Sequence, residues 1–143
     1  MIVIDASIAA KLYREEPGSV EAAELLAKYA GAISVPDVFA IEVAGVIVRD
    51  ANAYHGGAPL QQDKLLHFAE LLQSPAIELV RSDTSAVLRA SQMAMALGHP
   101  LKDCVYLVLA RDLACPLVTA DLKFLAKAQG LHPQIWPLVR QPE

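Results

Sequence analysis

Four acidic residues stand where the chain is expected to pass from one secondary-structure element to the next. Asp5 follows the apolar run 2–4, Asp121 follows the apolar run 116–119, and Asp103 lies at the start of an apolar helical segment. Glu42 lies in a helical segment where its neighbours one turn away are Val38, Phe39, Gly45 and Val46. Carboxylates that lie close together repel one another unless a cation or protons neutralise them. If the fold brings these acids together, they predict a site for a hard divalent ion.

Each acid also has a simpler interpretation. An Asp between a strand and a helix commonly caps the helix, as Asp5 and Asp121 would. Asp103 in a first turn interacts favourably with the helix dipole. Glu42 is harder to explain in this way, because an unpaired charge on an apolar helix face is costly and requires a partner such as a cation. Singly, these residues leave both interpretations open.

Oxygen ligands alone favour Mg²⁺ or Mn²⁺ over zinc. Beside a phosphate group, such an ion activates water and stabilises the leaving oxygen, which is the chemistry of phosphodiester hydrolysis. The four histidines have neither HxxxH nor HExxH spacing, and we expect them on the surface or in loops; they are His55, His67, His99 and His132.

The rest of the chain alternates between strand and helix patterns. Short apolar runs predict strands over 2–4, 32–35, 77–80 and 116–119 and a short edge strand over 134–136. Helical spacing predicts helices over 8–14 (capped by Ser7), 20–30, 36–48, 60–73, 84–97, 102–113 and 121–129. The helix over 36–48 is apolar nearly all round and is expected to be mostly buried, and 52–59 forms the clearest loop.

This alternation predicts one α/β domain over 1–143, with a three-layer α/β/α sandwich around a mainly parallel central sheet of four to five strands. In an open parallel sheet the working site lies beyond the carboxyl ends of the strands. Asp5 and Asp121 should therefore share one edge of the sheet, and Glu42 and Asp103 lie near the starts of helices that begin there.

Charge and composition narrow the function classes. Twelve Lys and Arg against sixteen Asp and Glu give a net charge of −4, the opposite of the basic footprint of a protein that coats duplex nucleic acid. The cysteines Cys104 and Cys115 form no CxxC pair and are expected to be buried free thiols. Because the chain opens without a signal-peptide pattern and has no apolar run near ~18 residues, we expect a cytoplasmic protein without a membrane partner.

Four stretches carry a family resemblance when their order and spacing are taken together. They are residues 2–7 (IVIDAS), 35–44 (VPDVFAIEVA), 102–110 (KDCVYLVLA) and 117–121 (LVTAD) followed by Phe124. In these stretches the chain resembles PIN-domain ribonucleases of the VapC toxin type, and the resemblance extends over nearly the whole sequence.

The resemblance implies a PIN-like fold and a metal-dependent endoribonuclease that acts as the toxin of a toxin–antitoxin pair. It implies that the catalytic and metal-binding residues are Asp5, Glu42, Asp103 and Asp121, with Ser7 and Thr119 as supporting hydroxyl residues. It also implies a homodimer and a VapB-type antitoxin whose C-terminal segment covers the acidic pocket. Gly45 departs from the family pattern, because many relatives have an asparagine there, so one hydrogen bond of the site is expected to be missing.

An RNA substrate needs cations for its phosphates. The candidates are Lys11, Arg14, Arg49, Lys102, Lys123 and Lys127. Each of them has the alternative of an ordinary solvated helix surface. Tyr13 is expected either to stack on a base or to pack between helices.

Two other enzyme or binding classes fit less well. A phosphoacceptor receiver domain would need an adjacent acidic pair after its first strand, where this chain has Ile4-Asp5-Ala6. A dinucleotide-binding domain would need GxGxxG glycines in the same turn, and they are missing. The alternative that the sequence leaves open is a PIN-fold protein that binds a metal or a partner protein without catalysis.

Overall fold

Five short strands form one parallel sheet in the computed structural model, which describes residues 1–53 and 58–138. The strands are β1 (Ile2–Ile4), β2 (Ile33–Pro36), β3 (Ile77–Val80), β4 (Leu117–Thr119) and β5 (Ile135–Pro137). Their order across the sheet is β3-β2-β1-β4-β5, and every neighbouring pair is parallel. The predicted parallel sheet of four to five strands is confirmed.

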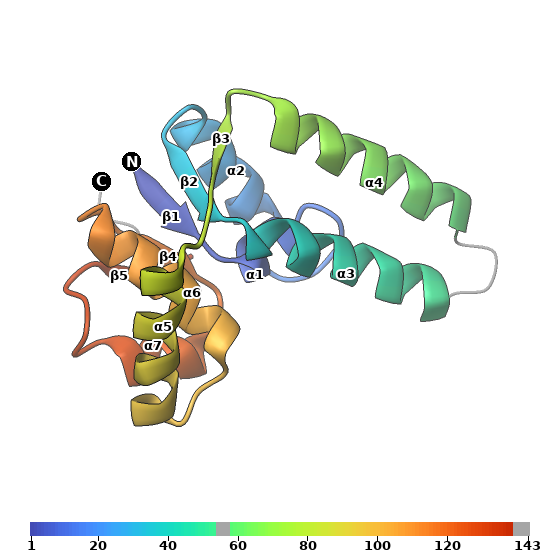
Figure 1. Ribbon diagram of the computed structural model, residues 1–143. Coiled ribbons are helices and arrows are strands. Elements are labelled where there is room, and N and C mark those ends of the chain that lie inside the picture. The colour runs from blue at the N-terminus through green and yellow to red at the C-terminus, as the bar shows by residue number, and fades with distance from the viewer. Residues whose placement is uncertain (54–57, 139–143) are drawn as a thin grey trace.

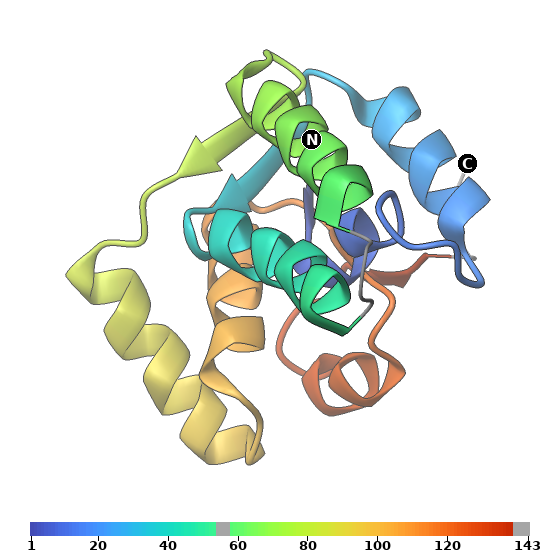
Figure 2. The ribbon, with the colours of Figure 1, turned by 90° about the vertical axis from the view of Figure 1, so that its right-hand side faces the viewer.

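Helices cover both faces of this sheet (Figures 1 and 2). They are α1 (Ala6–Ala10), α2 (Ser19–Tyr29), α3 (Val38–Ala53), α4 (Ala58–Gln73), α5 (Thr84–Leu97), α6 (Leu101–Asp112) and α7 (Leu122–Ala128). Right-handed crossovers place α1–α4 on one face and α5–α7 on the other, because the chain moves across the sheet in opposite directions in its two halves. This is the predicted three-layer sandwich.

The strand order reverses between β1 and β4. The chain runs from β1 to β2 and β3 in one direction, and then crosses to β4 and β5 on the other side of β1. Ligand crevices of parallel α/β sheets form at such a reversal, beyond the carboxyl ends of the strands. Asp5 directly follows β1, Thr119 ends β4, and the Asp5 amide donates to the Val118 carbonyl at 3.2 Å. The topology therefore places these residues beside the crevice.

The core fixes the strand ends from both faces. All three residues of β1 and of β4 are buried, and α6 packs its buried Tyr106 and Leu107 against the sheet. On the other face, the ring of Phe68 in α4 packs against Phe39 of α3 at 5.9 Å between centroids. Cys104 and Cys115 are buried free thiols, as predicted.

Several element boundaries differ from the predictions. The N-cap of α1 is Asp5 rather than Ser7, because the Asp5 carboxylate accepts from the Ser7 amide at 3.1 Å, and this helix already ends at Ala10. Helix α3 begins at Val38 rather than at residue 36, because Pro36 still pairs with Val80 in the sheet. Helix α5 has the predicted bounds 84–97, with Asp83 as its N-cap and Gly98 as its C-cap.

The region around the predicted loop 52–59 is more helical than expected. Helix α3 extends to Ala53 and α4 starts at Ala58, while residues 54–57, which include His55, lie outside the described part of the chain. The prediction that the helix after β2 is mostly buried is wrong for one of its faces, because Ile41 and Val48 are 76% and 46% exposed. None of the helices within 1–53 and 58–138 has both the length and the hydropathy of a membrane span.

Candidate active site

The carboxyl ends of β1 and β4 open into a cavity of about 800 Å³. Its lining includes all four predicted acids: Asp5, Glu42, Asp103 and Asp121. They come from four separate parts of the chain, namely the β1 end, α3, α6 and the turn after β4. The fold therefore brings the four acids to one cavity, as the sequence predicts.

Asp5 is held by donors on both of its carboxylate oxygens. Its Oδ1 accepts from the amide and the hydroxyl of Ser7, and its Oδ2 accepts from the hydroxyl of Thr119. A carboxylate has about four lone-pair positions for acceptance, so one position on Oδ2 remains for another ligand. Asp5 can thus cap α1 and bind a cation at the same time, and the two interpretations of this residue do not exclude each other.

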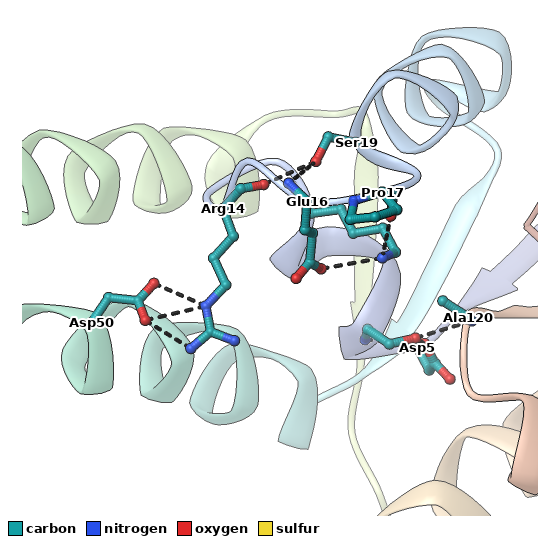
Figure 3. A network of polar contacts seen from close by, with 9 residues as sticks. Asp5, Arg14, Glu16, Pro17, Ser19, Asp50 and Ala120 are labelled. Atoms are coloured by element: carbon teal, nitrogen blue, oxygen red, sulfur yellow. Dashed lines mark hydrogen bonds and ion pairs between the residues drawn. The ribbon is translucent and has the colours of Figure 1, made fainter. Parts of the chain in front are cut away.

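Ser7 and Thr119 also connect the two strand ends. The Ser7 hydroxyl accepts from the Ala120 amide at 3.1 Å, and the Thr119 hydroxyl accepts from the Asp121 amide at 3.0 Å. Figure 3 shows Asp5 beside Ala120 at this junction. Both residues lie where a supporting role was predicted, because each fixes Asp5 and the turn that follows β4.

Burial raises the pKa of Asp5 from its usual 3.8 to about 6. The hydrogen bonds from Ser7 and Thr119 act in the opposite direction, while the negative charge of Asp103 raises the pKa further. A carboxylate that is 4% exposed and faces a second carboxylate is stabilised by a cation placed between them. The electrostatics of Asp5 thus favour a bound positive charge.

Asp121 also has two roles. Its Oδ1 accepts from the amides of Lys123 and Phe124 at 3.1 and 3.0 Å, which makes it the N-cap of α7. The capping interpretation is therefore correct, and Oδ2 takes no part in the cap. Asp121 is partly exposed, so this oxygen is open to the cavity.

Asp103 has an imidazole partner that the sequence analysis did not assign to the site. The Oδ2 atom of Asp103 lies 2.6 Å from Nε2 of His99, and the His99 ring stacks on Phe124 with 4.8 Å between centroids. Ligand atoms of His99, Asp103 and Asp121 all lie within 4.8 Å of one another. Asp5 and Glu42 line the same cavity but do not belong to this closer group.

Glu42 has polar partners, which a carboxylate on an apolar helix face requires. Its Oε1 accepts from the hydroxyl of Tyr106 at 2.8 Å, and its Oε2 lies 3.4 Å from Nζ of Lys102. Tyr106 is fully buried, and burial together with the Glu42 charge raises the pKa of this phenol far above its usual range. Tyr106 therefore stays protonated at neutral pH and donates its hydroxyl to Glu42.

These residues fit a divalent ion. The carboxylates of Asp103 and Asp121 and the imidazole of His99 converge, two further acids line the same cavity, and hard divalent ions bind carboxylate oxygens. Asp5 and Asp121 each retain an oxygen position that their capping bonds do not use. Gly45 also faces the cavity, and a Cβ built on it would meet no atom within 4 Å. The missing asparagine side chain therefore leaves open space beside Glu42.

The predicted RNA-contacting cations divide into two groups. Lys11, Arg14, Arg49 and Lys102 line the cavity, whereas Lys123 and Lys127 on α7 do not. The Lys127 ammonium instead donates to the Gly98 carbonyl at 3.0 Å. The cations around the cavity therefore come from the turn after α1, from α3 and from α6.

Two of the cavity cations are held by neighbouring acids. Lys11 pairs with Glu16 at 3.1 Å and donates to the Pro17 carbonyl, and the Arg14 guanidinium forms a two-pronged pair with Asp50. Figure 3 shows the Arg14 guanidinium paired with the Asp50 carboxylate of α3. The pairing fixes their side chains at the rim of the cavity.

Packing decides the other predictions about single residues. His99 and His132 lie in loops, one of the two predicted places, but the side chain of His99 is only 7% exposed and His132 is buried against the Cys115 carbonyl at 2.7 Å. Tyr13 is 4% exposed and packs edge-on against Phe68, so it does not stack on a base. His99 lies before Pro100, the N-cap of α6, so no helix spacing in the sequence indicates its contact with Asp103.

Comparisons with known proteins identify relatives of the chain. The profile of the family described as "PIN domain" matches residues 2–130. No curated protein matches the chain significantly.

Three solved structures illustrate the fold. A toxin–antitoxin complex from Klebsiella pneumoniae is 17% identical with a TM-score of 0.67, covering 95% of this chain and 100% of that one. The Mycobacterium tuberculosis toxin VapC20, which cleaves the sarcin-ricin loop, is 14% identical with a TM-score of 0.67. The match covers 88% of this chain and 94% of that one. FitAcB from Neisseria gonorrhoeae is 17% identical with a TM-score of 0.61, covering 96% of each chain. Similarity at this level of identity establishes a shared fold.

Proposed function

The chain belongs to the PIN domain family, and from this premise we propose that it is a divalent-metal-dependent endoribonuclease that hydrolyses RNA phosphodiester bonds. The observation that carries the proposal is the convergence of Asp5, Glu42, Asp103 and Asp121 on one cavity at the point where the strand order reverses. These four residues would hold Mg²⁺ or Mn²⁺, and Ser7 and Thr119 would orient Asp5.

Each protein group has a separate task in this reaction. When bound, the divalent ion supplies the positive charge that activates water and stabilises the leaving oxygen. Asp5 is oriented by three donors, and Glu42 is oriented by Tyr106. The cations at the rim, Lys11, Arg14, Arg49 and Lys102, would contact RNA phosphates on either side of the bond that is cut. Lys123 and Lys127 would contact phosphates further away, on the surface of α7.

The biological setting proposed is that of a toxin. The fold is shared with a toxin–antitoxin complex, with FitAcB and with the RNA-cleaving toxin VapC20. We therefore propose that the chain is the toxin of a VapBC-type pair, that it forms a homodimer, and that a VapB-type antitoxin covers the acidic cavity.

The test is cleavage of total cellular RNA by the purified protein with Mg²⁺ or Mn²⁺, against EDTA and an Asp121→Asn control. We expect metal-dependent cleavage that the control loses, with 5′-phosphate and 3′-hydroxyl ends on the products. Cyclic phosphate ends would contradict the mechanism, because they arise from attack by the RNA 2′-hydroxyl. Equal activity of Asp121→Asn would contradict the assignment of the site. A folded protein that binds metal and cleaves no RNA would favour an interaction module without catalysis.

A further inference from the structure

His99 lies beside two of the acids that are proposed to bind the metal ion. Its Nε2 atom is 2.6 Å from Oδ2 of Asp103, and its ligand atom lies within 4.8 Å of those of both Asp103 and Asp121. Asp121 belongs to a different element, the turn between β4 and α7. The imidazole thus lies beside two carboxylates from different elements, and Nε2 is the nitrogen that contacts Asp103.

The imidazole ring is held in this place from two sides. It stacks on the buried ring of Phe124, with an interplanar angle of 24° and 4.8 Å between centroids. The backbone on either side is also fixed, because Gly98 ends α5 in the left-handed conformation and Pro100 is the N-cap of α6. The ring is thus oriented before any ligand arrives, as metal-binding side chains need to be.

The spacing suits a common coordination sphere. With metal–ligand distances of about 2.1 Å in octahedral geometry, adjacent ligand atoms lie about 3 Å apart and opposite ones about 4 Å apart. The three ligand atoms here lie within 4.8 Å of one another, which is comparable with the separations within one coordination sphere. The hydrogen bond between His99 and Asp103 would be exchanged for two bonds to the ion.

We propose that His99 is a ligand of the metal centre beside Asp103 and Asp121, and that its nitrogen makes the centre prefer Mn²⁺ to Mg²⁺. The inference rests on the proposed function, which supplies the metal centre. It adds His99 as a ligand of that centre and a preference for Mn²⁺. Mg²⁺ is a hard ion that takes oxygen ligands, whereas imidazole nitrogen suits transition metals. A centre with only the four acids as protein ligands would lack this source of discrimination.

The direct test is pulsed electron paramagnetic resonance of the wild-type protein loaded with Mn²⁺. A histidine nitrogen bound to Mn²⁺ modulates the echo, and isotopic labelling of the histidines changes that modulation. We expect a nitrogen signal from the wild type that is lost in His99→Gln. The matched control is His67→Gln on α4, which lies outside the cavity lining and should keep the signal.

The same variants give a second readout through metal affinity. In calorimetric titrations of His99→Gln, we expect Mn²⁺ to bind at least roughly tenfold more weakly, with Mg²⁺ affinity changed by less than about twofold. Circular dichroism spectra of the variants report whether they fold. Because the wild-type spectrum needs no variant, the test stands even if a substitution unfolds the protein.

The outcomes separate this inference from the proposed function. Wild-type protein that binds Mn²⁺ without a nitrogen signal would overturn the role of His99 as a ligand, while metal-dependent RNA cleavage would be unaffected. Equal losses of Mn²⁺ and Mg²⁺ affinity in His99→Gln would overturn the metal preference and indicate that His99 only positions Asp103. A wild-type protein that binds no Mn²⁺ would overturn both proposals.

Discussion

The acidic cavity has two sides that are held in different ways. On the strand side, Asp5 is 4% exposed and receives hydrogen bonds from Ser7 and Thr119, which also fix the turn after β4. On the helix side, the side chains of Asp103 and Glu42 are 16% and 15% exposed and are held by His99, Tyr106 and Lys102.

The difference indicates how the two sides contribute. The strand side is part of the hydrogen bonding that closes the sheet edge, so substitutions there should alter metal binding and folding stability together. On the helix side the carboxylates themselves are more exposed, so substitution of their exposed partner Lys102 should alter binding and leave stability nearly unchanged. Four predictions test this contrast, in order of decreasing effect.

The largest effect is expected for Asp5→Asn. We expect RNA cleavage to fall by at least about a hundredfold, because residues that merely support metal ligands already cost 10–100-fold when changed. The free energy of unfolding in EDTA should stay the same or rise, since the substitution removes a buried charge whose pKa burial raises. Urea unfolding and cleavage assays measure the two effects. Cleavage that persists in Asp5→Asn would remove this residue from the site.

Thr119→Val keeps the shape of a fully buried side chain and removes its hydroxyl. We expect Mn²⁺ affinity to fall by roughly tenfold, because Asp5 loses a donor that orients it. The free energy of unfolding should fall by about 1–2 kcal/mol, because the Asp121 amide also loses its acceptor. Ser91→Ala on the exposed outer side of α5 is the control. A change in stability without a change in affinity would mean that Thr119 serves the fold alone.

The pH dependence of stability isolates the strand side. The pKa of Asp5 is about 6 in the folded protein, against its usual value of 3.8. At pH values between these two, the folded protein therefore binds more protons than the unfolded chain. Stability of the metal-free protein should therefore rise as pH falls from 7 to 5, with a contribution from Asp5 of about 1 kcal/mol. Urea unfolding of wild type and Asp5→Asn across this range measures it as the difference between them. If the free energies of unfolding of wild type and Asp5→Asn change in parallel with pH, Asp5 does not take up a proton between pH 7 and 5.

Lys102→Met tests the helix side and should have the smallest effect on stability. The Lys102 side chain is 58% exposed and 3.4 Å from Glu42, and exposed ion pairs of this kind contribute little. We expect the free energy of unfolding to change by less than about 0.5 kcal/mol. RNA affinity should weaken and its salt dependence should become shallower, because one phosphate contact is lost. A large loss of stability would contradict the contrast between the two sides.

The sequence was sufficient for the strand side because its signals are local. Apolar runs that end at Asp5 and Thr119 predict both the strands and their carboxyl ends, and parallel pairing brings these ends together. The cap of α1 stayed ambiguous because Asp5 and Ser7 are both good capping residues, and only the geometry shows that the Asp5 carboxylate accepts from the Ser7 amide.

The helix side was predicted less completely because its contacts are long-range. Tyr106 and Glu42 are 64 positions apart, so no local pattern indicates their hydrogen bond. His99 was expected on the surface or in a loop, and it does lie in the turn before α6, where side chains are usually exposed. Packing against Phe124 buries the ring instead. Because His99 precedes the N-cap Pro100, no helix spacing links it to Asp103.

The measurement that tests the account most directly is anomalous diffraction from crystals grown with Mn²⁺. A single strong peak should lie in the cavity within bonding distance of Asp103 and Asp121 and close to Oδ2 of Asp5. That result would show that both sides of the cavity serve one metal centre. Mn²⁺ bound elsewhere, or ordered crystals with no peak among these acids at saturating Mn²⁺, would contradict the central claim.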